Sequence, residues 1–285
     1  LLAQTIQPSL FEVIVVDNNS SDNTRDMVNG FVPSFGGRLK YCFEEIKGKT
    51  FALNKGIATA QGEILAFTDD DVSLDARWLD CLLSCFKDHD CDAAGGRVLP
   101  VYPKETPQWI KNNKQELCGP IVYYNYGEKT KKYDVPMSEF IGANVAIKSA
   151  IFKEAGTFRT DLGPGQGTFG DDSEMLRRLY KMKKSLYYCG EALVWHPAET
   201  KRMNLRYIAS WNFGYGKFLG VREKQVIPES TVFCGRVPRY LIGELIFTFI
   251  RMASHLFVKK NFLNGWIEFH RIRGRLKFFK DNYKK

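Results

Sequence analysis

The sequence predicts an α/β fold built on a mostly parallel central sheet, and three observations support this prediction. Apolar runs of strand length alternate with stretches of helix-compatible composition between residues 12 and 87. Two of these runs, residues 12–17 and 64–67, end at or beside a carboxylate, as strands do at the ligand-binding edge of such sheets. The hydrophobic share of 44% and the charged share of 26% are ordinary for a globular chain that buries a full core.

The first half of the chain supplies these elements in alternating order. Strands are predicted at residues 12–17, 38–44 and 64–67. Helices are predicted at residues 25–31, 51–60 and 75–87. A polar turn rich in N-cap residues precedes the first helix, and Gly62 marks the end of the second. Strands and helices that alternate in this way predict parallel βα units.

The pattern loosens between residues 93 and 141, where five prolines and a run of tyrosines interrupt it. We predict irregular structure with a β-hairpin in this stretch, of the kind that shapes a substrate pocket. Regular elements return after it, with strands predicted at residues 138–148, 186–189 and 192–195 and helices at residues 152–155 and 172–183.

Three consecutive carboxylates, Asp69, Asp70 and Asp71, follow the strand at residues 64–67. Adjacent carboxylates repel one another, so a folded protein keeps them together when a cation lies beside them. Oxygen ligands favour Mg²⁺ or Mn²⁺ over Zn²⁺. The alternative is an acidic turn that caps the helix starting near Asp75.

A second polar cluster follows the strand that ends at Asp17. Its alternating oxygen-bearing side chains suggest a calcium loop, but position six is Asp22 rather than Gly, and position twelve is Val28 rather than Glu. An Asp at a strand end followed by small polar residues suits hydrogen bonding to a base or ribose. A simple N-cap of the next helix is the alternative.

A third cluster combines glycines with an acidic pair. Glycines make residues 163–170 a permissive loop, and Asp171 and Asp172 stand at the start of the next predicted helix. One of these carboxylates can act as a general base facing a pocket. Alternatively, both only stabilise the helix N-terminus through its dipole, which contributes about 0.3–1 kcal/mol.

These clusters together resemble the family 2 glycosyltransferases of the GT-A fold. The residues that carry the resemblance, in order along the chain, are Asp17–Asp22, Asn54–Ile57, Thr68–Val72, Gly142–Asn144 and Gly170–Asp172. It covers roughly residues 1–200 and implies a Rossmann-like GT-A domain there. Residues 1–5 then correspond to the end of the family's first helix, and the first strand is missing from this sequence. Residues 201–285 form a C-terminal helical, basic and amphipathic extension.

The resemblance also implies roles for individual residues. Contacts to the nucleotide sugar are expected from Asp17, Asn18, Asn54, Asp69, Asp70 and Asn144. Metal ligands are expected from Asp71, Asp69 and His196, although a His beside a Trp is often only a packed, hydrogen-bonded side chain. Asp172 is the expected general base and Asp171 the alternative. The sequence departs from the family where Asn18 replaces a frequent second Asp, and where Asp171 replaces a usual Glu.

The implied reaction is metal-dependent, with Mn²⁺ or Mg²⁺, and inverts the anomeric configuration. It moves a sugar from a nucleotide sugar, expected to be a UDP-sugar, to a hydroxyl of a glycan or lipid-linked acceptor in cell-surface polysaccharide synthesis. A nucleotidyltransferase of related fold is the alternative enzyme. A truncated, inactive family member is a further alternative.

The positive charge of the chain is concentrated at its C-terminal end. Of the net charge of +9, most belongs to the residues after Pro238, where eleven Lys and Arg face three acids. Residues 241–258 are apolar, but their ionisable side chains would be costly at a bilayer centre. At helical spacing these polar side chains form one stripe, made of Glu244, Thr248, Arg251 and His255.

Such a segment either lies on an anionic membrane surface or packs on the catalytic domain. A nucleic-acid-binding module that uses the basic tail is a third possibility, but it leaves the acidic clusters unexplained, so no nucleic-acid partner is expected. The seven cysteines are odd in number and contain no CxxC pair, which favours a reducing compartment over a disulfide framework or a thiolate zinc site. We therefore expect a cytoplasmic protein, peripheral on the inner face of the membrane.

Overall fold

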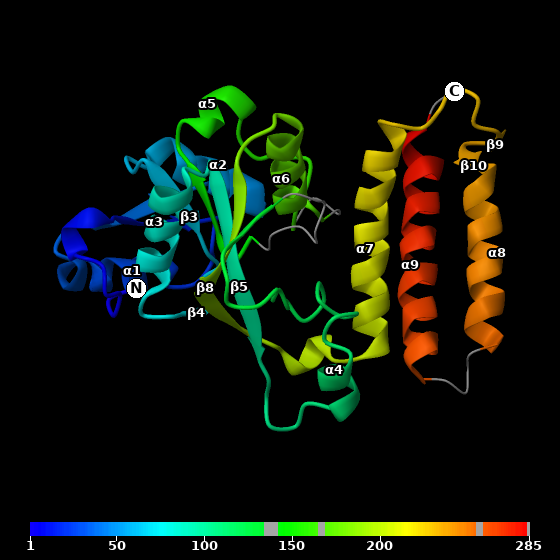
Figure 1. Ribbon diagram of the computed structural model, residues 1–285, viewed down its shortest axis with the longest axis horizontal. Helices are drawn as coiled ribbons and strands as arrows, with labels where there is room; N and C mark the ends of the chain where they lie inside the picture. Colours follow the sequence, from blue (N-terminus) through cyan, green and yellow to red (C-terminus); the bar gives the residue numbers. More distant parts are fainter. Residues whose placement is uncertain (134–141, 165–168, 255–258, 284–285) are drawn as a thin grey trace. The chain divides into compact units, whose positions relative to one another are not determined.

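The computed structural model describes residues 1–133, 142–164, 169–254 and 259–283, and it divides into two compact units (Figure 1). The first unit comprises residues 1–101, 122–166 and 171–197. The second comprises residues 102–121, 167–170 and 198–285. The sequence predicts a single boundary near residue 200, whereas the second unit also takes in two stretches from within the predicted GT-A domain.

The N-terminal part of the first unit is a parallel βα unit, as predicted. Strand β1 (Val13–Asp17) pairs in parallel with β2 (Leu39–Phe43), and helix α1 (Thr24–Phe31) connects them. Helix α2 (Lys49–Thr59) packs against β1. Short 3-10 helices flank these elements at η1 (Pro8–Leu10) and η2 (Pro33–Phe35).

The larger sheet of the first unit has the strand order β3–β7–β5–β8–β4. Strand β4 pairs with the end of β8, at Val194 and Trp195, and β6 pairs with its beginning, at Tyr187 and Tyr188. Its strands are β3 (Ile64–Phe67), β4 (Ser73–Leu74), β5 (Ala93–Val101), β6 (Lys131–Lys132), β7 (Val145–Lys148) and β8 (Leu186–Pro197). The α/β class is therefore confirmed, but the pairing is mixed. Strands β5 and β8 are parallel, whereas β7 runs antiparallel to both of its neighbours, β3 and β5. Because β7 is inserted between them, β3 and β5 keep a common direction without pairing to each other.

Strand β5 is the main element that the sequence does not predict. It occupies the middle of the sheet, in a stretch that was expected to be irregular because of its prolines and tyrosines. The structure explains Gly96. A Cβ there would lie 2.3 Å from the carbonyl oxygen of Ala192 and 2.4 Å from Nδ2 of Asn144. Position 96 therefore requires glycine, because the side chain of Asn144 crosses directly over it.

That side chain, Asn144, joins three elements of the first unit. It is fully buried; its Oδ1 accepts a hydrogen bond of 2.8 Å from Nε1 of Trp78 on α3 (Trp78–His89). Its Nδ2 donates to the carbonyl oxygens of Arg97 (2.9 Å) and Ala192 (2.8 Å). A buried amide with every partner in place fixes one arrangement of α3, β5 and β8.

Two further helices complete the first unit, α5 (Ile151–Ala155) and α6 (Asp171–Lys181). Both were predicted. The predicted strand at residues 138–148 is β7, and its first residues lie outside the described part of the chain. The two short strands predicted at residues 186–195 form one continuous strand, β8.

The second unit is mainly helical, which confirms the predicted C-terminal helical segment. Its elements are α4 (Gln108–Asn112), η3 (Thr200–Arg202), α7 (Leu205–Lys224), β9 (Phe233–Cys234), β10 (Val237–Pro238), α8 (Arg239–Ser254) and α9 (Lys259–Asn282). Helix α9 lies between α7 and α8 (Figure 1). Glycines allow the close approach of α7 and α9: a Cβ at Gly216 would lie 2.1 Å from the carbonyl oxygen of Arg271. Among the described residues, no helix is both long and apolar enough to cross a bilayer.

The structure predicts that Asn144→Ala destabilises the first unit by about 3 kcal/mol. Truncation leaves the indole N–H of Trp78 and two backbone carbonyls buried without partners, each of which costs about 1–3 kcal/mol, partly offset by relaxation. Urea unfolding measures the change. Asn29→Ala, at an exposed position of α1, is the matched control and should change stability by less than about 0.5 kcal/mol. An equal effect of both substitutions would contradict the bridging role.

Candidate active site

Asp17 is held in a fixed orientation at the carboxyl end of β1. Only 6% of the residue is exposed, and its oxygens accept hydrogen bonds from the backbone N–H of Ser20 (2.9 Å) and the hydroxyl of Tyr41 (2.7 Å). The hydrogen bonds from Ser20 and then from Tyr41 hold the pKa of Asp17 below its usual range. Asp17 is therefore a fixed negative charge at the edge of the sheet.

Two of the amides predicted to contact the nucleotide form hydrogen bonds with neighbouring loops. Asn18 donates to the carbonyl oxygen of Ile46 (2.7 Å) and accepts from the N–H of Gly48 (2.6 Å), which fixes the turn before α2. Asn54 makes two bonds of 2.9 Å to the N–H and the carbonyl oxygen of Phe158. Asn144, described above, has no polar atom left for a ligand. The structure thus gives all three amides internal partners.

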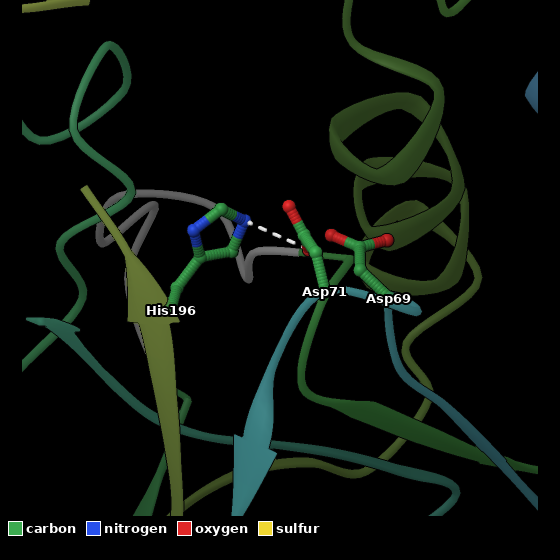
Figure 2. A group of neighbouring side chains, drawn as sticks. All are labelled: Asp69, Asp71 and His196. Carbon is green, nitrogen blue, oxygen red and sulfur yellow. Dashed lines mark ion pairs between the residues drawn. The ribbon is translucent and has the colours of Figure 1, made fainter. Parts of the chain in front are cut away.

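The structure brings the three predicted metal ligands together. Asp69, Asp71 and His196 each offer one ligand atom, and these atoms all lie within 4.8 Å of one another. Figure 2 shows Asp71 between His196 and Asp69, with the His196 ring turned toward Asp71. Asp70, between the two other carboxylates, is exposed.

Strand pairing explains this convergence. The chain leaves β3 through the three carboxylates and then pairs β4 with β8, so that Ser73 lies opposite Trp195. Asp71 and His196 flank that pair in the sequence. Their side chains therefore meet, with 3.6 Å between Nε2 of His196 and Oδ1 of Asp71.

The surroundings of His196 select one tautomer. The ring is 4% exposed, and its Nδ1 lies 3.0 Å from the carbonyl oxygen of Pro197. A carbonyl oxygen only accepts, so Nδ1 carries a proton, and Nε2 is the ring nitrogen that faces Asp71. This is the arrangement expected of a histidine that ligates a metal.

Lys49 is the site residue that the sequence analysis misses. Its ammonium forms an ion pair with Asp69 and lies close to Gly142 and to the acidic pair of α6. Burial alone would lower the pKa of Lys49, but Asp69, and then Asp171 and Asp172, hold it above its usual range. One signal was present in the sequence: a lysine just before a predicted helix opposes the helix dipole, and such local conflicts mark functional sites.

Asp171 and Asp172 begin α6, as predicted. Asp172 accepts hydrogen bonds from the N–H groups of Gly142 (2.9 Å) and Ser173 (2.7 Å). Burial, reinforced by the charge of Asp171, raises the pKa of Asp172 to about 7. Burial also raises the pKa of Asp171, while Lys49 opposes that rise. The pair therefore contains a carboxylate that can take up a proton near neutral pH.

The loop before α6 must approach Asp171 closely. Gly163 has φ of +98°, and a Cβ there would lie 3.1 Å from Cγ of Asp171. Both facts require glycine. A cavity beside this loop is lined by Lys49, Gly142, Asp171 and Asp172 together with apolar side chains.

Comparison with known proteins agrees with this arrangement. The family model for "Glycosyl transferase family 2" matches residues 1–156. A glucosyl-dolichyl phosphate glucuronosyltransferase of Haloferax volcanii is 27% identical over 164 residues, which cover 57% of this chain and 50% of that protein. The chain thus spans about half the length of this relative.

Two solved structures share the fold. S. aureus TarS, residues 1–349 in complex with UDP, superposes with a TM-score of 0.51 at 13% identity, covering 100% of this chain and 86% of that one. GalNAc-T7 with UDP, GalNAc and Mn²⁺ superposes with a TM-score of 0.54 at 14% identity, covering 98% and 51%. With these folds and the family match, this chain belongs to glycosyl transferase family 2.

Proposed function

We propose that this chain carries out metal-dependent, inverting transfer of a sugar from a UDP-sugar to a hydroxyl of a glycan or lipid-linked acceptor. One observation carries the proposal. Asp69, Asp71 and His196 form a candidate metal site, and Asp69 also forms an ion pair with Lys49. Lys49 in turn lies near Asp171 and Asp172, and the pKa of Asp172 is about 7. The membership of the family favours this reaction over the nucleotidyltransferase alternative.

The donor set fits a divalent cation. Two carboxylates and Nε2 of His196 are hard and borderline ligands of the kind that Mn²⁺ accepts, and Mg²⁺ is the alternative where the carboxylates dominate. When bound, such an ion would supply positive charge that stabilises a departing diphosphate. The structure of GalNAc-T7, which contains both UDP and Mn²⁺, supports Mn²⁺ as the ion that accompanies a UDP-sugar in this fold.

The acidic pair of α6 supplies the base. Asp172 would accept the proton of the acceptor hydroxyl as its oxygen attacks the anomeric carbon, and a pKa near 7 suits that task at neutral pH. A single base and a single displacement produce inversion, without a covalent intermediate on the protein. Asp171, more deeply buried, would keep Lys49 in place.

The remaining partners follow from charge and from the relatives. Asp17 and Asp70 are the candidates for contacts to base and ribose, because each carboxylate oxygen can accept more than one hydrogen bond. A UDP-sugar donor is supported by the UDP in both solved structures. The name of the Haloferax relative supports a lipid-linked acceptor, and the basic C-terminal region supports action at the inner face of a membrane in cell-surface glycan synthesis.

We predict that Asp71→Asn abolishes metal-dependent UDP binding. Removing one of three ligand atoms should weaken the affinity for UDP in the presence of Mn²⁺ by about 100-fold, while the weak binding without metal is unchanged. Calorimetric titration of UDP with and without Mn²⁺ measures both. Asp88→Asn, exposed on α3, is the matched control. Equal metal dependence in Asp71→Asn and wild type would rule out this metal site.

We predict that Asp172→Asn slows transfer but stabilises the protein above pH 7. The folded-state pKa is raised, so protonated Asp172 favours folding at low pH, and this contribution is lost as pH rises toward 7. Asparagine stays neutral, so the variant should be more stable by about 1–3 kcal/mol at pH 8, and the difference should vanish near pH 4.

UDP release from a panel of UDP-sugars, with added saccharide or water as acceptor, should fall by about 10²–10⁴-fold in the same variant. UDP binding should be retained. Asp171→Asn separates the two carboxylates: if it loses turnover while Asp172→Asn keeps it, Asp171 is the base.

A further inference from the structure

Helix α8 presents an apolar face that nothing in the described part of the second unit covers. Four large side chains on it are more than half exposed: Ile246 (56%), Phe247 (64%), Phe249 (54%) and Ile250 (61%). Ile246 and Ile250 are one helical turn apart, so they share one face, and the phenylalanines border it. Large side chains gathered in this way mark an interaction surface.

Two residues of the predicted polar stripe contact the rest of the second unit, whereas Arg251 is exposed. Thr248 is 4% exposed, and Glu244 pairs with Arg275 of α9 at 2.7 Å. Leu241 and Met252 are buried along the same side. The fourth residue of the stripe, His255, lies outside the described residues. Helix α8 therefore packs on α9 through the side that carries Leu241, Thr248 and Met252, and its isoleucine and phenylalanine face stays exposed.

Cations stand at both ends of this apolar face. Arg239 is exposed in the first turn of α8 and Arg251 in the last, where its guanidinium lies 5.8 Å from the centre of the Phe247 ring. The chain after Pro238 carries eleven basic residues and three acids. The surface is thus apolar in the middle and positive at its margins.

We propose that α8 docks this protein on an anionic lipid bilayer, with Ile246, Phe247, Phe249 and Ile250 entering the boundary between headgroups and acyl chains. A helix on a membrane buries such side chains about 5–10 Å deep while Lys and Arg bind lipid phosphates. Two copies of this chain meeting through α8 would bring two strongly basic regions together, and the two isoleucines at the centre of the face give nucleic-acid bases no flat stacking surface. Charge and chemistry both favour lipid.

This inference adds a binding surface to the membrane location included in the proposed function, and it does not depend on catalysis. Vesicle binding can fail while UDP binding persists, and the reverse is equally measurable. Each proposal can therefore be overturned without the other.

The test is flotation of the full chain with vesicles of phosphatidylglycerol, compared with vesicles of phosphatidylcholine, both free of glycolipid. We expect binding to the anionic vesicles, and Ile246→Ser/Ile250→Ser should lower the partition coefficient by about tenfold or more. Leu10→Ser/Met27→Ser is the matched control, because these first-unit side chains are 62% and 56% exposed. Unchanged UDP binding by both double variants verifies that they fold.

Arg239→Gln/Arg251→Gln should lower binding to the anionic vesicles and reduce its dependence on salt. Three results would overturn the proposal: no flotation with either vesicle, equal loss in the control variant, or binding unaffected by Ile246→Ser/Ile250→Ser. A dimer in sedimentation that Ile246→Ser/Ile250→Ser dissociates, without any vesicle binding, would make this face a contact between copies of the chain.

Discussion

The ammonium of Lys49 is the charge on which the acidic site depends. It pairs with Asp69 after β3 and offsets the buried carboxylates of Asp171 and Asp172 at the start of α6. Without a cation there, desolvation and mutual repulsion would drive more of these groups into their protonated forms. Lys49 begins a helix, where the dipole disfavours it, so Asp69 and the acidic pair compensate for its position.

This arrangement refines what the acidic run in the sequence indicates. Three adjacent carboxylates require a cation, and the sequence assigns that role to a metal. The structure supplies Lys49 to Asp69 and leaves Asp71 turned toward His196. Within the acidic run, Asp69 therefore contacts a lysine as well as the candidate metal site, and Asp71 contacts His196. The sequence could place these residue types at a sheet edge. It could not show that β4 pairs with β8, a long-range contact that brings His196 to Asp71.

The same distinction separates the predicted from the unpredicted parts of the fold. Elements with clear hydrophobic runs or caps, such as β1, α1 and α6, were found from the sequence within a few residues. Strand β5 was not, because Gly96 has no side chain to show that it is a strand residue. Gly96 has to be glycine because the side chain of Asn144, from a distant part of the sequence, occupies the space that a Cβ would need. The resemblance assigns Asn144 to the nucleotide sugar, and the structure adds that this buried side chain has three internal hydrogen-bond partners.

Two carboxylates of the first unit acquire opposite chemistry from their surroundings. Hydrogen bonds from Ser20 and Tyr41 lower the pKa of Asp17, so it is ionised throughout the physiological range and can only accept. Burial and Asp171 raise the pKa of Asp172 to about 7, so it can gain and lose a proton. Environments that push carboxyl pKa values apart distinguish a binding group from an acid–base group. The different roles proposed for Asp17 and Asp172 therefore rest on the environment of each carboxylate, since both are aspartates.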